Sequence, residues 1–235
     1  MIIKFSDMPS VYVYKSEGGK NKKYAEFIVG YCKAVGLMHN NKLCVRCSPH
    51  MALCLAAACE KYGVGLYVVT GASGGVKENL EKMGAVVYPM AGGFQVGIDD
   101  AVSKGAYHYD QFTNPASAEY YKSVAAGAVA ELGFTPDNFV DFIGSGATLA
   151  GFASALGNTR CYRAGMCDRD PDLSKNPMLA PVADKITKIK VEKTDVYAMQ
   201  QKYAEEAVGQ VNIGTVAALK AAENLQGTTL IYWQD

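Results

Sequence analysis

The sequence predicts an α/β protein in which mainly parallel sheets are covered by helices on both faces. Short apolar runs rich in β-branched and aromatic residues alternate with segments whose apolar residues recur at helical spacing. The connections between these segments are short. Alternation of this kind builds a parallel sheet with helices on both sides.

In the first half of the chain, strands are short apolar runs and helices tend to end at glycines such as Gly36 and Gly63. The expected strands are residues 11–14, 43–46, 65–70, 85–88 and 107–109. The expected helices are residues 24–35, 51–62, 76–83 and 92–104. The order from residue 43 to residue 88 is βαβαβ, the repeating unit of a parallel sheet.

The second half continues the alternation but contains one long interruption. The expected helices are residues 116–132, 149–156, 194–208 and 213–224, and the expected strands are residues 139–143, 161–166, 189–191 and 228–233. Residues 168–183 are rich in proline, aspartate, asparagine and serine, which predicts a long loop.

Composition limits the function classes. Lysine plus arginine equals aspartate plus glutamate at 23 each, so no net charge steers the protein to nucleic acid or an anionic membrane. We expect a protein partner, a homo-oligomer or a small molecule instead. No segment approaches the ~20 apolar residues of a membrane span, and we expect a cytoplasmic protein. The fifteen tyrosines mark either a contact surface or ordinary core packing.

The cysteines predict thiols in a reducing compartment, because seven is an odd number and their spacing forms no disulfide framework. Cys44, Cys47 and His50 have the spacing C-x-x-C-x-x-H, which three soft metal ligands would need. Cys44 lies in an apolar run that predicts a buried strand, and no second cysteine or histidine pair follows at zinc-site spacing. We therefore expect core cysteines and no metal site.

The most informative local motif is FVDFIGSGATLAG, residues 139–151, in which an apolar strand runs into a glycine-rich turn that opens a helix. Such a turn directs backbone N–H groups and the positive end of a helix dipole at one point. The predicted phosphate cradle is Gly144, Ser145, Gly146, Ala147 and Thr148. A tight turn whose glycines serve only packing is the alternative. The turn has no P-loop lysine, which argues against ATP.

Four segments together resemble one known family. The glycine-rich motif is similar to F-V-A-G-V-G-T-G-G-T-L-T-G, the phosphate loop of cysteine synthases, and YHYDQFTNPAS, residues 107–117, resembles Y-x-x-x-Q-Q-F-x-N-P-A-N. Residues 45–88 are similar in layout to the loop T-S-G-N-T-G and the elements after it, and VNIGTVAAL, residues 211–219, resembles G-I-S-S-G-A-A-V-A-A-A-L. Their order and spacing agree with the tryptophan synthase β-like superfamily, the fold type II enzymes that use pyridoxal phosphate (PLP).

This resemblance implies two small three-layer α/β sub-domains. Residues 11–36 and 107–235 would form the larger, cofactor-binding sub-domain, and residues 37–106 the smaller inserted one. It also implies PLP as the cofactor, held by a lysine through a Schiff base. Counting from Gly18 and Gly19 selects Lys22 as that lysine, whereas matching the K-N-R pattern of threonine synthases selects Lys20. We favour Lys22, and three solvated lysines are the alternative.

The resemblance assigns further residues to the site. Asn212 stands where the family has the serine that contacts the pyridine nitrogen, and His50 stands at the asparagine that contacts the PLP 3′-oxygen. Gln111, Phe112 and Ser48 would hold the substrate. The family's T-S-G-N-T-G is rewritten here as CSPHMA, residues 47–52, so that only the serine survives. Proline has no N–H, and methionine and alanine have no side-chain donor, so the grip on a substrate carboxylate should be weak.

Three hypotheses remain open. The favoured one is a divergent cysteine-synthase-like protein with weak or lost catalysis and a structural or partner-binding role, in the cytoplasm or in a virus particle or other assembly. The second is an active PLP enzyme that performs β-replacement or β-elimination on a small amino acid. The third is a phosphate- or nucleotide-binding regulator that uses only the glycine-rich turn.

Overall fold

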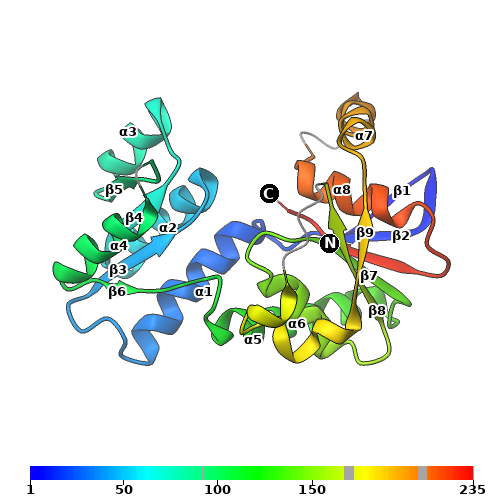
Figure 1. Cartoon of the computed structure of the whole chain (residues 1–235), viewed down its shortest axis with the longest axis horizontal. Helices are drawn as coiled ribbons and strands as arrows, with labels where there is room; N and C mark the ends of the chain where they lie inside the picture. Colours follow the sequence, from blue (N-terminus) through cyan, green and yellow to red (C-terminus); the bar gives the residue numbers. More distant parts are fainter. Residues whose placement is uncertain (92, 167–171, 206–210, 235) are drawn as a thin grey trace. The chain divides into compact units, whose positions relative to one another are not determined.

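The computed structural model describes residues 1–91, 93–166, 172–205 and 211–234, and it divides into two units. The larger unit comprises Met1–Lys20 and Phe112–Asp235, and the smaller unit comprises Asn21–Gln111. Both units consist of helices on mainly parallel sheets (Figure 1), so the predicted α/β class is confirmed.

The larger unit is built on a six-stranded sheet with the strand order β1-β2-β10-β7-β8-β9. Its strands are β1 (Ile2–Phe5), β2 (Met8–Tyr14), β7 (Asn138–Phe142), β8 (Arg160–Gly165), β9 (Ile186–Lys190) and β10 (Thr229–Tyr232). Neighbouring strands are parallel except β1 and β2, which form an antiparallel pair at the edge. The sheet therefore has a common carboxyl edge for five of these strands.

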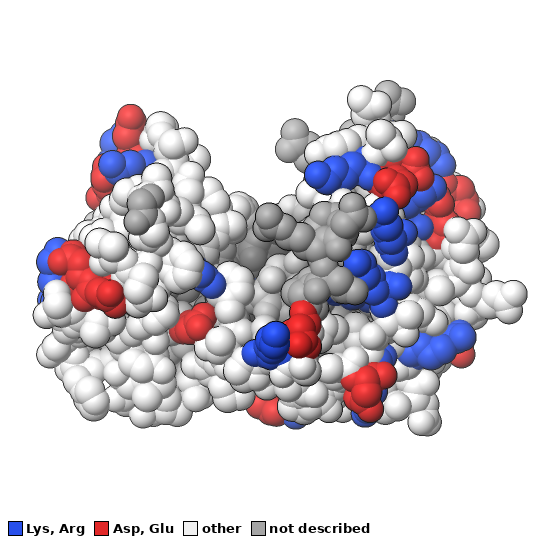
Figure 2. All heavy atoms as spheres, viewed as in Figure 1, with Lys and Arg blue, Asp and Glu red and all other residues white. Residues whose placement is uncertain are grey.

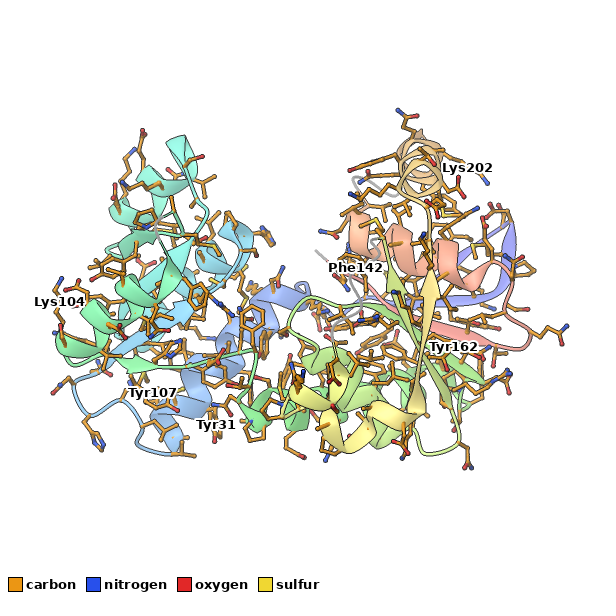
Figure 3. All side chains as sticks on the ribbon, in the orientation of Figure 1. Tyr31, Lys104, Tyr107, Phe142, Tyr162 and Lys202 are labelled. Atoms are coloured by element: carbon orange, nitrogen blue, oxygen red, sulfur yellow. The ribbon has the colours of Figure 1, made fainter. Side chains whose placement is uncertain are left out.

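Helices cover both faces of this sheet (Figure 1). The helices are α5 (Pro115–Leu132) and α6 (Ala147–Ala155) on one face, and α7 (Lys193–Glu205) and α8 (Ile213–Ala222) on the other. Successive strand residues point to opposite faces. Phe139 of β7 accordingly stacks on Phe152 of α6, with ring centroids 4.1 Å apart, while Val140 lies in the core beneath α8. Phe142 and Tyr162, labelled in Figure 3, are partly buried against that same core.

The smaller unit is built on a four-stranded parallel sheet with the order β5-β4-β3-β6. Its elements are α1 (Lys20–Ala34), which begins at the unit boundary, β3 (Lys42–Arg46), α2 (Pro49–Tyr62), β4 (Gly65–Thr70), α3 (Gly74–Lys82), β5 (Val86–Pro89), α4 (Phe94–Ser103) and β6 (Tyr107–His108). Helix α4 packs on one face, where Ile98 contacts Cys44 and Val69. Right-handed crossovers place α2 and α3 on the opposite face.

The unit boundary differs from the expected one, because α1 belongs to the smaller unit from Asn21 onward. Contacts with α2 account for this. The Lys33 amine donates a hydrogen bond to the backbone oxygen of Tyr62 at 2.8 Å, and Lys61 lies 3.2 Å from Glu26. The helix therefore packs within the smaller unit.

Most other expected elements are present with small shifts of their ends, and β4 has the expected bounds. Strand β1 was not expected. In the expected loop 168–183, the part from residue 172 onward contains two short 3₁₀ helices, Leu173–Lys175 and Ala180–Lys185. Residues 206–208 of the expected helix 194–208, and residue 92 of the helix 92–104, lie outside the described residues. Among the helices that are described, none is both long and apolar enough to cross a membrane.

Candidate functional site

Three segments leave the carboxyl edge of the larger unit's sheet side by side. Strands β2, β10 and β7 are parallel neighbours, so their ends lie at one edge. Lys20 follows β2 after a five-residue connection, the glycine-rich turn follows β7, and Gln234 follows β10. Ligands of open α/β sheets bind at this edge.

The glycine-rich turn has room on one side and close packing on the other. Strand β7 ends at Phe142 and α6 begins at Ala147, after Gly146, whose φ of 88° is left-handed. A Cβ atom added at Gly144 would meet nothing within 4 Å, whereas one at Gly146 would lie 2.7 Å from Leu179 Cδ1. The first N–H groups of a helix have no intrahelical acceptor. Ser145 and the buried Thr148 add hydroxyls to these donors, as the predicted phosphate cradle requires.

Side chains fix this turn from outside. The Asn176 amide donates to the backbone oxygen of Phe112 at 3.1 Å and of Ser145 at 3.5 Å, while its oxygen accepts from the Met178 N–H at 2.9 Å. The hydroxyl of Ser145 accepts weakly from the Ala147 N–H at 3.4 Å. The predicted substrate residue Phe112 therefore shares with the turn a backbone contact to one asparagine.

Lys20 is partly buried against aromatic rings. Its amine lies 5.0 Å from the ring centroid of Tyr232 and 5.6 Å from that of Tyr121. Lys22, which the glycine count favoured, is exposed and belongs to the smaller unit. Of the two candidate lysines, Lys20 belongs to the unit that carries the carboxyl edge of β2, β10 and β7.

A buried carboxyl group lies at the end of β7. Asp141 is 2% exposed, and its Oδ1 accepts a hydrogen bond from the Gln234 side-chain amide at 2.8 Å. Burial raises the pKa of the Asp141 carboxyl above its usual value, and the charge of Lys20 and the Gln234 hydrogen bond oppose that rise. Gln234 also donates to the backbone oxygen of Phe142 at 2.9 Å. Asp141 and Gln234 are thus joined by a hydrogen bond at the end of β7.

Asn212 caps helix α8. Its side-chain oxygen accepts from the Gly214 N–H at 2.8 Å, so the oxygen faces the helix. Gly214 is held close to the end of β10, because a Cβ added there would lie 2.6 Å from the Gln234 side-chain oxygen. Asn212 is therefore near the carboxyl edge that carries Lys20 and the glycine-rich turn, as its predicted role requires.

The predicted substrate loop of the smaller unit is occupied with capping its own helix. Ser48 is the N-cap of α2, and its hydroxyl accepts from the Met51 N–H at 3.3 Å. The N–H of Ala52 donates to the Ser48 backbone oxygen, and Pro49 has no N–H. The backbone N–H groups of Ser48 and His50 also belong to this turn. The side chain of His50 is exposed.

Gln111 lies in the smaller unit, at the boundary with the larger one. Its side-chain amide donates to the backbone oxygen of Arg46 at the end of β3, at 2.6 Å. The bond ties the chain after β6 to the end of β3, the strand that precedes the Ser48 loop. The predicted substrate residues Ser48 and Gln111 are thus both at the carboxyl ends of strands in one sheet.

The cysteines proposed as core residues are buried. Cys44 is 0% and Cys47 is 5% exposed, while His50 is exposed. Burial raises the pKa of the Cys44 thiol to about 12 and also raises that of Cys47, which disfavours the thiolate that a metal needs. Within the described part of the chain, histidine, cysteine, aspartate and glutamate side chains do not gather in threes or more where they could hold a metal ion.

Sequence reasoning missed Asp141, Tyr121, Tyr232 and Gln234. A signal for Asp141 was present, because an acidic residue interrupts the apolar strand where the phosphate-loop motif quoted above has alanine. The other three gave no local signal, since their role depends on side chains that are distant in the sequence.

Comparison with known proteins identifies a family and a set of solved structures with the same fold. A protein family described as pyridoxal-phosphate dependent enzyme matches residues 25–225. No curated protein sequence matches the chain significantly.

Solved structures with the same fold include an O-acetylserine dependent cystathionine β-synthase from Helicobacter pylori, with 19% identity, a TM-score of 0.76 and coverage of 99% of this chain and 90% of that one. An O-ureido-L-serine synthase has 20% identity and a TM-score of 0.76 over 96% of this chain and 84% of its own. A hydrogen sulfide-producing enzyme from Fusobacterium nucleatum has 15% identity and a TM-score of 0.79 over 99% and 91%. At these identities the likeness shows the fold alone.

Proposed function

Because the chain belongs to the pyridoxal-phosphate dependent enzyme family, we propose that it is a cysteine-synthase-like protein that binds PLP but turns over small amino acids weakly or not at all. Its main role would then be structural or partner-binding. The observation that carries the second half of this proposal is the loop before α2, where Ser48 and Pro49 leave few donors for a substrate carboxylate.

The donor set of the larger unit fits the cofactor. The turn at residues 144–148 offers backbone N–H groups and two hydroxyls, and there is open space where a Cβ of Gly144 would lie, which suits a phosphate group. The oxygen of Asn212 accepts from Gly214, and its amide nitrogen is the side-chain group that can donate to a pyridine nitrogen. Bound PLP supplies an electron sink for charge that develops on the carbon next to an amino-acid amine.

We assign the covalent attachment to Lys20 rather than Lys22. The amine of Lys20 lies beside Tyr232 and near Asp141 at the carboxyl edge, in the same unit as the glycine-rich turn and Asn212. Lys22 is exposed and lies in the other unit. This choice corresponds to the K-N-R pattern, with Lys20, Asn21 and Lys22 at its three positions.

The weak grip follows from how α2 begins. A carboxylate that binds at a helix N-terminus needs N–H groups that have no other acceptor. The N–H of Met51 is bonded to the Ser48 hydroxyl, and Pro49 has none, so the N–H and imidazole of His50 would have to hold the anion. We expect a low affinity for amino acids at this loop.

The test measures cofactor binding and turnover separately. PLP-loaded protein is assayed with O-acetyl-L-serine and sulfide, and we expect a kcat below about 1 s⁻¹, the low end of the usual range for enzymes. The matched variant Pro49→Gly, Met51→Thr restores two donors of the family motif and should bind O-acetyl-L-serine more tightly. A wild-type kcat well inside the usual range would refute the loss of catalysis, and failure to bind PLP would refute the cofactor assignment.

The second candidate is an active β-replacement or β-elimination enzyme. It is favoured by the position of Lys20, whose amine lies 5.0 Å from the Tyr232 ring centroid in the unit that carries the glycine-rich turn. In that case Lys20 would also exchange the proton on the substrate carbon, and Gln111 and Ser48 would hold the substrate.

A partner-binding role predicts a stable complex or oligomer by native mass spectrometry, and an inert monomer would argue against it. Figure 2 shows acidic and basic side chains interspersed on the visible face of each unit.

A further inference from the structure

The hydroxyl of Ser16 joins the segment that carries Lys20 to the end of strand β10. Ser16 follows β2, and its Oγ lies 2.6 Å from the hydroxyl oxygen of Tyr232, 216 residues later in the sequence. Tyr232 is 0% exposed, so its side of this hydrogen bond is shielded from water. A hydrogen bond in such surroundings is stronger than one in bulk water. The bond therefore fixes the start of the connection between β2 and α1.

The same connection turns sharply before it reaches Lys20. Gly18 and Gly19 have φ values of 78° and 91°, in the left-handed region that residues with a Cβ atom rarely adopt. The Gly19 N–H donates to the backbone oxygen of Ser16 at 3.0 Å and closes the turn. Ser16 thus holds both ends of this short loop, because its side chain bonds to β10 and its backbone oxygen bonds to the residue immediately before Lys20.

The amine of Lys20 lies against the ring to which Ser16 is bonded. Its Nζ is 5.0 Å from the ring centroid of Tyr232 and 5.6 Å from that of Tyr121, within the range of about 6 Å over which an ammonium group is attracted to a ring face. Tyr121 is 2% exposed and meets Tyr232 edge to face, with the centroids 6.0 Å apart. The two buried rings form a fixed surface for the amine.

Other contacts hold the Tyr232 ring independently of its hydroxyl. Tyr14 of β2 stacks on it with centroids 5.8 Å apart, and Phe152 of α6 stacks on it at 5.9 Å. The next residue, Trp233, donates its backbone N–H to the Tyr14 backbone oxygen at 2.9 Å. The hydrogen bond to Ser16 can therefore be removed while the ring stays packed.

We propose that Ser16 is a positioning residue, which through its hydrogen bond to Tyr232 holds the amine of Lys20 over the Tyr232 and Tyr121 rings, ready for attachment of PLP. The inference rests on the proposed function, in which Lys20 is the attachment lysine. Ser16 acts through the loop and the Tyr232 ring.

The chemistry of attachment explains what this positioning contributes. The neutral amine forms a double bond to the aldehyde carbon of PLP, and its two hydrogens leave with the aldehyde oxygen as water. A long lysine side chain loses rotamer entropy when its amine is held at one place. Where the fold has already placed the amine, attachment carries less of that cost and is faster.

The first arm of the test measures the Lys20 amine without cofactor. Apo protein is trace-labelled with acetic anhydride, and fragment-ion mass spectrometry gives the ratio of acetylation at Lys20 to that at exposed Lys22. We expect a ratio below one in the wild type, because two rings shield the Lys20 amine. The ratio should rise about threefold in Ser16→Ala and in Tyr232→Phe, the size expected when an ammonium–ring contact loosens.

A double variant and a control separate positioning from a general loss of stability. Ser16→Ala, Tyr232→Phe should give the same ratio as either single variant, since both substitutions remove one hydrogen bond. Ser154→Ala removes another serine hydrogen bond of the same unit, from its hydroxyl to the Ala150 backbone oxygen, and should leave the ratio at the wild-type value. A double variant whose ratio rises by the product of the two single effects would contradict a shared bond.

The second arm adds PLP and quenches samples with borohydride at successive times. The rate of attachment to Lys20 should fall about fivefold in Ser16→Ala and in Tyr232→Phe, the ordering cost of one long side chain. A wild-type ratio at or above one, or a ratio or an attachment rate that neither variant changes, overturns the inference and leaves the proposed function standing. If the ratios change as expected but PLP is attached to no lysine, the proposed function fails and the role of Ser16 in attachment fails with it. If Ser16→Ala does not fold, Tyr232→Phe, which keeps the packed ring, decides.

Discussion

Replacing Gly151 by alanine tests the crossing of α5 and α6, which positions the glycine-rich turn. A Cβ atom at Gly151 would lie 2.5 Å from Tyr121 Cβ and 2.7 Å from both the Ala118 backbone oxygen and the Tyr121 carbonyl carbon. Carbon atoms are ordinarily about 3.5–4.0 Å apart at contact. Two of the three obstructing atoms are backbone, which cannot rotate away, so one helix must move.

The magnitude follows from two opposing effects. Alanine in a helix is favoured over glycine by about 0.5–1 kcal/mol, whereas overpacking of this kind costs about 1–3 kcal/mol or more. With backbone obstruction the second effect is at its upper end, and we expect a net loss of about 2 kcal/mol. For a chain of this size the loss corresponds to a fall in Tm of about 4–8 °C.

Gly127→Ala in α5 is the matched control. A Cβ there would lie 3.9 Å from the Tyr14 hydroxyl, an ordinary contact, so this helical glycine should gain about 0.5–1 kcal/mol from alanine. Thermal unfolding followed by circular dichroism measures both variants, and PLP titration reports whether the turn is displaced. A Gly151→Ala protein as stable as Gly127→Ala would refute the close helix crossing.

Three further predictions concern single groups. Burial raises the pKa of the Cys59 thiol from 9.0 to about 12. Between these two pH values the folded state keeps a proton that the unfolded chain releases, so Cys59 lowers the free energy of unfolding by about 1.4 kcal/mol per pH unit. In Cys59→Ala the free energy of unfolding, measured in urea, should fall less steeply with pH. An unchanged slope would contradict this. Asn212→Asp should keep the hydrogen bond from the Gly214 N–H and the stability of the protein. It should weaken PLP binding by about tenfold, because a carboxylate cannot donate a hydrogen bond. Equal affinity for PLP would argue against a donor role of Asn212. Ser48→Ala should cost about 1 kcal/mol in urea unfolding through loss of the Met51 cap, and no loss would show that the serine is not engaged as a cap.

The regular elements were predictable where local pattern and tertiary environment agree. Strand β4 (Gly65–Thr70) was predicted with its observed bounds, because a continuous apolar run follows the helix-ending Gly63. Strand β1 was missed, since its four residues are held by antiparallel pairing with β2, which the local sequence does not reveal. The family resemblance and the cysteine-synthase-like fold are confirmed by the family match and the solved structures.

Counting residues from the two glycines does not reveal the environment of either candidate lysine. Gly18 and Gly19 favoured Lys22, but the environment of a lysine is set by side chains that come from distant segments. Tyr232 lies beside Lys20 because β2 and β10 are neighbours in the sheet, and Tyr121 comes from α5, about a hundred residues away in the sequence from both. The capping of α2 by Ser48 was not predicted, although a serine followed by proline at the start of a helix is typical of an N-cap.

The most direct test of the central claim, a PLP site built by the larger unit around Lys20, is borohydride reduction of the PLP-treated protein followed by peptide mapping. We expect a pyridoxyl group on Lys20, retained in Lys22→Ala and lost in Lys20→Ala. A pyridoxyl group on Lys22, or labelling that persists in Lys20→Ala, would contradict it.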